Sequence, residues 1–148
     1  MYINECFIKH NNEKILNSLK ELGYKEMFKD ILGMPCLTTT KDGFIIPSSI
    51  YNRNNAIDCD ENDDMFLALA AMRDDSDKDQ YFVRDEEQRW RDANGWNIIK
   101  KGSLEKCLID DYSVILNPKD KNGKLIMVGL GPKMHKATTE EIINYFNK

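Results

Sequence analysis

The chain lacks the sequence features that mark most catalytic and metal-binding sites. It has only two histidines, His10 and His135, and neither is next to a plausible nucleophile in the sequence. Its four cysteines form no Cys-x-x-Cys pair, so they give no zinc-site or redox-motif spacing. We therefore expect a protein that is not an enzyme and that needs no cofactor or metal ion.

Long apolar runs are also absent. The longest, Met65 to Met72 and Leu125 to Leu130, fall far short of the ~20 residues that a membrane-spanning helix needs. The N-terminal residues do not combine a basic start, an apolar stretch and a small-residue cleavage site, so no signal peptide is expected. These absences predict a soluble, cytoplasmic protein.

Concentrated basic charge is missing as well. The net charge is −4 and the isoelectric point is near 5.2, and the basic residues are dispersed along the sequence. Nucleic-acid binding draws on a concentrated basic surface. The composition therefore gives no strong signal for a nucleic-acid partner, and no heptad pattern indicates an oligomeric state.

What is present is the composition of an ordinary globular protein. The chain has 148 residues, of which 41% are hydrophobic and 31% are charged. That length is enough to bury a core without disulfides or metal ions. Since no repeat, low-complexity tract or linker marks a boundary, we predict a single α+β domain over residues 1–148.

The first predicted helix has clear signals at both ends. Asn11 and Asn12 supply an N-cap, and Gly23 stands where a left-handed residue ends many helices. Between them lies an apolar stripe at helical spacing, formed by Ile15, Leu16, Leu19 and Leu22.

Two further helices are predicted. One follows the acidic stretch Asp58 to Asp64 and continues to Met72, and because it is apolar nearly all round it is expected to be buried. The other begins with a capping box formed by Thr138 and Glu141.

The predicted strands come as hairpins rather than as successive β-α-β units. Hairpin turns are expected at Asp42-Gly43, Asn94-Gly95 and Asn122-Gly123. We therefore predict an α+β fold with a mainly antiparallel sheet of about five to six strands and three helices packed on it. The predicted strands are Glu5 to Lys9, Leu37 to Ile46 as two runs, Gln80 to Val83, Trp96 to Ile99, Tyr112 to Leu116 and Leu125 to Leu130. The polar stretch Arg84 to Asp92 is left open between a helical turn and an exposed loop.

An acidic run suggests a calcium site. Asp75, Asp77, Asp79 and Glu86 occupy the first, third, fifth and twelfth places of an EF-hand loop. Gln80 stands at the sixth place, where the sharp turn of that loop requires glycine, and the following residues look extended. We interpret the run as a solvated acidic loop that ends a helix, and calcium binding is left open.

The cysteines and histidines offer one catalytic alternative. A Cys–His dyad would need to assemble in space, for instance from Cys6 and His10 or from Cys107 and His135, and nothing in the sequence selects either pair. The cysteines are scattered and each lies beside apolar residues. We expect free, mostly buried thiols at Cys6, Cys36, Cys59 and Cys107.

The best candidate recognition surface is rich in tryptophan and arginine. Such side chains together can stack on a base or anchor a protein interface. The alternative is that one tryptophan fills the core while the arginines are solvated. The candidate ligand- or partner-binding residues are Arg84, Arg89, Trp90, Arg91 and Trp96.

Three stretches carry a resemblance to known proteins. They are Glu5 to Lys9 with Leu19 to Lys25, then Met65 to Val83, and finally His135 to Phe146. Together they resemble uncharacterised small proteins encoded by phages and prophages of gut Bacteroidales. The resemblance implies a phage accessory protein made inside a bacterial host cell, and it implies no activity and no site residues.

We therefore expect a non-enzymatic binding module of phage or prophage origin. It would bind a host protein or a small molecule, with counter-defence as one use. One alternative is a structural or accessory component of the virion. A less favoured alternative is an enzyme with a spatially assembled Cys/His or carboxylate site.

Overall fold

The structure is a computed structural model that describes residues 2–29, 36–40, 43–46, 56–112, 122 and 133–147. Its backbone contacts divide the chain into two compact units. Unit 1 consists of Met1–Asp75 with Thr139–Lys148, and unit 2 of Ser76–Thr138. That the chain forms a single domain stays a prediction.

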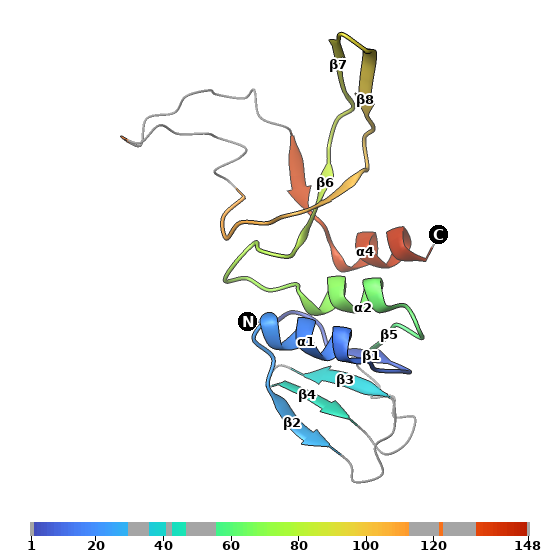
Figure 1. Ribbon diagram of the computed structural model, residues 1–148, viewed down its shortest axis with the longest axis vertical. Coiled ribbons are helices and arrows are strands. Elements are labelled where there is room, and N and C mark those ends of the chain that lie inside the picture. Colours follow the sequence, from blue (N-terminus) through green and yellow to red (C-terminus); the bar gives the residue numbers. More distant parts are fainter. Residues whose placement is uncertain are drawn as a thin grey trace. The chain divides into compact units, whose positions relative to one another are not determined.

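Unit 1 contains a five-stranded mixed sheet (Figure 1). Its strand order is β2-β4-β3-β1-β5. The central strand β3 pairs antiparallel with β1 and β4, whereas β1–β5 and β2–β4 are parallel pairs. The strands are β1 (Cys6–Ile8), β2 (Glu26–Lys29), β3 (Leu37–Thr40), β4 (Gly43–Ile46) and β5 (Ile57–Asp58).

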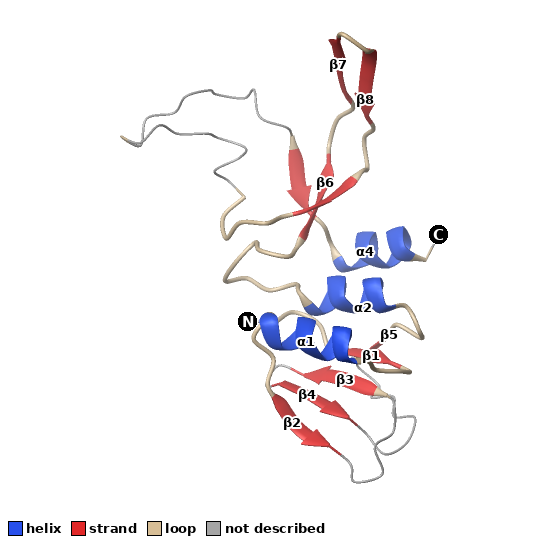
Figure 2. Cartoon of the chain, in the orientation of Figure 1, coloured by secondary structure: helices blue, strands red, loops and turns tan. Residues whose placement is uncertain are grey.

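Three helices accompany this sheet in the described part of unit 1: α1 (Glu13–Glu21), α2 (Asp63–Ala70) and α4 (Thr139–Phe146) (Figure 2). The predicted signals of the first helix are confirmed. The Asn12 side chain accepts a hydrogen bond from the Ile15 N–H at 2.9 Å, which caps α1. Gly23 follows its end with φ of +102°, a conformation that favours glycine.

The second helix is buried, as its sequence predicts. Asn62 caps α2 by accepting from the Met65 N–H at 3.0 Å, and five of the helix's apolar side chains are buried.

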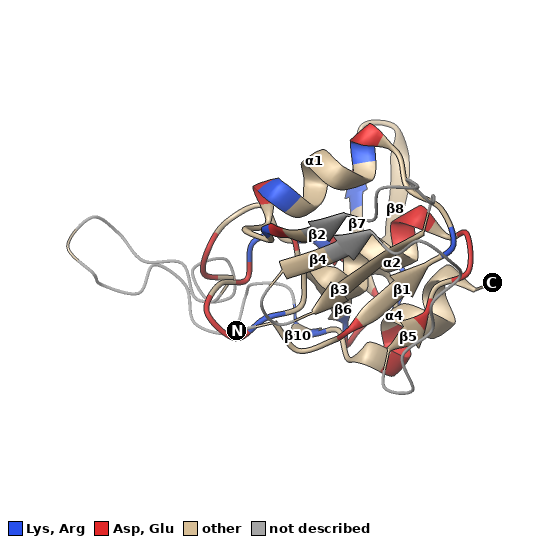
Figure 3. Ribbon diagram, turned by 90° about the horizontal axis from the view of Figure 1, so that it is seen from below, with Lys and Arg blue, Asp and Glu red and all other residues tan. Residues whose placement is uncertain are grey.

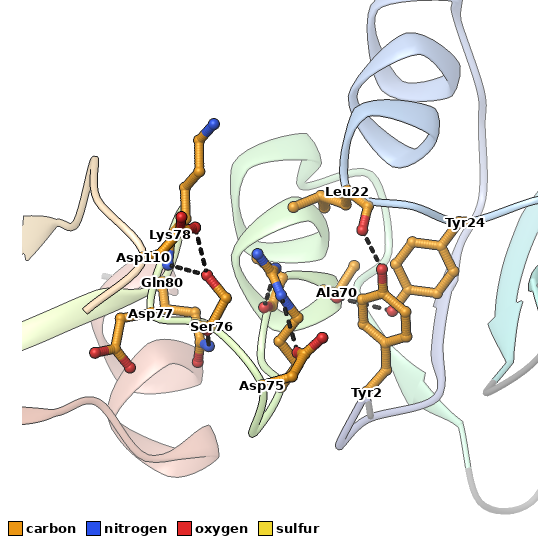
Figure 4. Close-up of polar contacts among 12 residues, drawn as sticks. Tyr2, Leu22, Tyr24, Ala70, Asp75, Ser76, Asp77, Lys78, Gln80 and Asp110 are labelled. Carbon is orange, nitrogen blue, oxygen red and sulfur yellow. Dashed lines mark hydrogen bonds and ion pairs between the residues drawn. The ribbon is translucent and has the colours of Figure 1, made fainter. Parts of the chain in front are cut away.

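Two tyrosines link neighbouring segments of unit 1 by hydrogen bonds to backbone carbonyls (Figure 4). Tyr24 donates to the Ala70 carbonyl at 2.7 Å, and Tyr2 donates to the Leu22 carbonyl.

Unit 2 contains a three-stranded antiparallel sheet with β6 (Tyr81–Arg84) between β10 (Met134–Lys136) and β9 (Leu104–Lys106). A small apolar cluster lies on it, in which the rings of Phe82 and Tyr112 stack with centroids 4.1 Å apart. The cluster is formed by Phe82, Cys107, Tyr112 and Met134. A separate two-stranded sheet consists of β7 (Gln88–Asp92) and β8 (Gly95–Ile99).

The α+β class, three helices and mostly antiparallel pairing are confirmed in the described residues. The finer prediction of one sheet of about five to six strands built from hairpins is only partly matched. The described strands form three sheets, of five, three and two strands, and two of the pairs are parallel. Parallel strands need a long connection. The described residues between β1 and β5 include α1 and three further strands, and no local turn signal announces this pairing.

Some predicted strands lie where the structure gives no description. The predicted pair after Tyr112, at residues 113–116 and 125–130, lies outside the described residues. The hairpin between Leu37 and Ile46 is confirmed as β3 and β4, with Gly43 already paired to Thr40. The choice between a helical turn and a loop for Arg84 to Asp92 is wrong, because Gln88–Asp92 forms strand β7.

In strand β3, substitutions of two adjacent threonines are expected to change the free energy of unfolding in opposite directions. Thr38 and Thr39 are fully buried. The Thr38 hydroxyl has no hydrogen-bond partner among the described residues, whereas the Thr39 hydroxyl accepts from the Cys6 N–H at 2.9 Å. A buried polar group without a partner costs roughly 1–3 kcal/mol. We expect Thr38→Val to raise the free energy of unfolding by about 1 kcal/mol and Thr39→Val to lower it by about 1–2 kcal/mol. Urea titration of both variants measures this, and equal effects would contradict it.

Candidate functional site

The candidate recognition residues lie in and beside the β7–β8 hairpin of unit 2 (Figure 1). Polar contacts at the turn hold it in shape. The Asp92 carboxylate accepts from the Asn94 N–H at 2.8 Å and from the Asn97 side chain at 2.7 Å. Gly95 has φ of +113°, which favours glycine. A turn is confirmed here, one residue earlier than predicted: Ala93 and Asn94 form it, and Gly95 begins β8 opposite Asp92. It joins two strands instead of a loop and a strand.

The register of the hairpin decides which side chains share a face. Arg89 lies opposite Ile98, and Arg91 lies opposite Trp96. Because side chains alternate between the two faces of a strand, these four lie on one face, which we call the basic face. Trp90 lies opposite Asn97 on the other face, called here the Trp90 face. The structure therefore separates the two tryptophans.

The basic face combines positive charge with exposed apolar surface. The Arg91 guanidinium lies over the Trp96 ring, 6.0 Å from its centroid, within the range of a weak cation–π contact. Arg89 forms an ion pair with Glu87 at 2.9 Å. Trp96 is 68% exposed and Ile98 is 49% exposed, so the hairpin presents both to solvent. Large apolar side chains beside arginine are the usual anchors of protein interfaces.

The Trp90 face is more polar. Trp90 itself is 43% exposed. It shares this face with Gln88, Asp92, Asn97 and Ile99, and the Asn97 side chain donates to the Asp92 carboxylate. Neither tryptophan fills the core, so the alternative of one core tryptophan with solvated arginines does not describe this hairpin.

Arg84 differs from the other four candidate residues. It ends β6 and is only 7% exposed, and its guanidinium donates to the Gln88 side chain at 2.7 Å and to Glu105 at 3.1 Å. Arg84 therefore joins the three-stranded sheet to the first residue of the hairpin. It is placed to position the hairpin and not to contact a partner directly.

Sequence reasoning missed Ile98 as a member of this surface. The signal was present, since Trp96 and Ile98 are two residues apart in a predicted strand and must share a face. Lysines and arginines elsewhere are dispersed over the described elements (Figure 3). The basic face differs from them because it holds two arginines, Arg89 and Arg91, on the same face as an exposed tryptophan.

The carboxylates of the acidic run have separate partners. Asp75 forms an ion pair with Arg73, and Glu86 one with Lys133. Asp77 accepts from the Tyr112 N–H at 2.8 Å. In this run Ser76 donates to Asp110 and accepts from the Lys78 N–H (Figure 4). Across the described residues, no group of three or more His, Cys, Asp or Glu side chains is arranged to hold a metal ion.

Each histidine ring is hydrogen-bonded to an aspartate. His10 bonds to Asp63, and His135 Nδ1 lies 2.5 Å from Asp85 Oδ1. Neither of these contacts supplies a nucleophile. Each histidine thus has an aspartate partner, which does not favour the alternative of a dyad with Cys6 or Cys107.

The four cysteines are free and buried, as predicted. Burial raises the pKa of the Cys36 and Cys107 thiols. The pKa of Cys59 is raised by its contact with the Cys6 thiol and by burial. Since the thiolate is the nucleophile, these surroundings oppose a reactive cysteine.

Within the described ranges, no helix is long and apolar enough to cross a membrane. No protein-family model, curated protein or solved structure was found to match the chain.

Proposed function

We propose that this chain is a non-enzymatic binding module of phage or prophage origin that binds a host protein through the β7–β8 hairpin. The observation that carries the proposal is the exposure of both tryptophans on one hairpin, with Arg89 and Arg91 on the same face as Trp96. Tryptophan and arginine are the residues most enriched among those that dominate binding energy at protein interfaces. The phage origin rests on the sequence resemblance alone, and the site of action is the cytoplasm of the bacterial host.

A protein partner is favoured over a small molecule by the shape of the site. Small-molecule sites are concave and enclose most of the ligand. Every residue of β7 is exposed, and β8 alternates between exposed and half-buried residues. A two-stranded ribbon open on both faces offers no enclosure of its own, but it can enter a groove on a larger partner.

A nucleic-acid partner is less favoured for two reasons. Bases stack in succession on aromatic side chains that share one surface, whereas Trp90 and Trp96 lie on opposite faces. The chain also carries a net charge of −4, which repels a phosphate backbone at long range.

The test is affinity capture from Bacteroidales host extract with the whole chain as bait, followed by calorimetry with the purified host protein that is recovered. We expect the double variant Arg91→Ala/Trp96→Ala to weaken binding by about 2 kcal/mol or more, roughly a 30-fold rise in Kd, because it removes both anchors of the basic face.

Leu108→Ala is the matched control. Leu108 is 75% exposed, lies in the same unit and is outside the hairpin, so this variant should bind as the original chain does. Equal affinity of the double variant and the control would refute the proposed role of the hairpin. Failure of the original chain to recover any host protein would refute the binding function.

A further inference from the structure

The β7–β8 hairpin is a two-stranded sheet, so each strand has one edge that is unpaired among the described strands. β7 and β8 also contact chiefly each other. An isolated two-stranded hairpin is at best marginally stable in water, and three or more strands with an apolar face are usually needed. An open edge is a template for a further strand unless it is protected by charge, proline or a bulge.

The two edges differ in that protection. β7 carries Arg89, Arg91 and Asp92, which are charged. β8 is Gly-Trp-Asn-Ile-Ile, with no charged residue and no proline. Its register with β7 is continuous over five pairs, without a bulge. The edge of β8 is therefore the unprotected one.

We infer that two copies of the chain associate by pairing β8 with β8, antiparallel about a two-fold axis at Asn97, to form a four-stranded sheet from two hairpins. In this register Asn97 lies opposite Asn97 of the second copy. Trp96 of each copy lies opposite Ile98 of the other, on the same face. Aromatic and β-branched residues directly opposite each other are a favourable cross-strand pair.

The same construction fails on the other edge. If two β7 strands paired about Trp90, Arg89 of each copy would lie opposite Arg91 of the other. Like charges directly opposite each other destabilise a sheet. The second copy therefore pairs with β8 and not with β7, because the neutral sequence of β8 is complementary to itself.

The dimer leaves the faces of the hairpin available. Pairing at the β8 edge places two basic faces side by side, with Trp96 and Ile98 of both copies between the arginines of the two β7 strands. This inference does not depend on the proposed host partner, because it concerns the purified chain alone.

The first test is the molar mass of the purified full-length chain, measured by light scattering over a wide range of concentrations. We expect the mass to rise from the 17.2 kDa of one chain toward twice that value. A mass that stays at that of one chain at every concentration would overturn the inference.

The second test locates the contact. Directly opposed residues in an antiparallel pair have Cα atoms about 4.5–5.5 Å apart, which suits a disulfide. Under mild oxidation, Asn97→Cys should therefore cross-link at least roughly tenfold faster than Ala93→Cys, an exposed control at the tip of the same turn. The native cysteines are buried and leave the introduced thiol as the accessible one. Equal cross-linking rates would show that any association uses another surface, which also overturns the inference.

Discussion

Gly43→Ala is expected to lower the free energy of unfolding by about 3 kcal/mol, although it adds a single methyl group. Gly43 begins β4, between β2 and β3, and has φ of +155°. A Cβ atom there would overlap the Lys25 carbonyl oxygen and lie 2.7 Å from Cγ of Met27. The Lys25 carbonyl accepts from the Phe44 N–H at 2.8 Å, so it cannot retreat without loss of that bond.

The matched control is Gly95→Ala in the hairpin. Gly95 also has positive φ, at +113°, but an added Cβ would meet no atom within 4 Å. This control should therefore cost only the backbone strain, about 1–2 kcal/mol. Denaturant titration of both variants measures the difference. Equal losses of unfolding free energy in the two variants would show that the close approach of the Lys25 carbonyl to Gly43 does not add to the cost of Gly43→Ala.

Arg84→Ala is expected to lower the free energy of unfolding by about 3 kcal/mol. The substitution removes a buried cation that bonds to Gln88 and to Glu105. Loss of one partner of a buried ion pair costs roughly 3–5 kcal/mol. The lower end applies because the Glu105 side chain is 44% exposed and water can solvate it once Arg84 is gone.

Arg89→Ala is the control for this experiment. Arg89 is five residues further along, and its ion pair with Glu87 joins side chains that are 60% and 42% exposed. Exposed pairs contribute little, so we expect a change below about 0.5 kcal/mol. Calorimetric unfolding of both variants separates the two roles. Similar losses for Arg84→Ala and Arg89→Ala would contradict the buried role of Arg84.

The elements that could be predicted from the sequence are those fixed by local signals. Asn12 and Gly23 bound α1 because a side-chain cap and a left-handed residue act on neighbouring backbone groups. The same holds for the turn that leads into Gly95, whose positive φ favours glycine.

Strand β7 was not predicted because its residues are polar apart from Trp90 and all of them are exposed, so no burial pattern marks them. The pairing with β8 could have indicated this strand instead. A two-residue turn before Gly95 requires a strand of matching length on its other side, and Gln88 to Asp92 is that strand. The parallel pairs β1–β5 and β2–β4 had no such local signal, because they depend on contacts between segments far apart in the sequence.

The candidate site was predictable in its residue types but not in its geometry. Arginine and tryptophan indicate a recognition surface wherever they are exposed together. Whether Arg84 belongs to that surface depends on Glu105, which lies 21 residues away and pairs with it across the sheet. The division of Trp90 and Trp96 between opposite faces depends on the register with β8.

Both tryptophans lie on an ordered, solvent-exposed hairpin. The chain has only two tryptophans, so their indole N–H signals in a nitrogen-15 NMR spectrum report on this hairpin alone. Adding a soluble paramagnetic agent at low protein concentration tests the claim directly. We predict two resolved signals, both broadened, with Trp96 (68% exposed) broadened more than Trp90 (43% exposed). A signal that the agent leaves unchanged, or two signals at the positions of an unfolded chain, would contradict it.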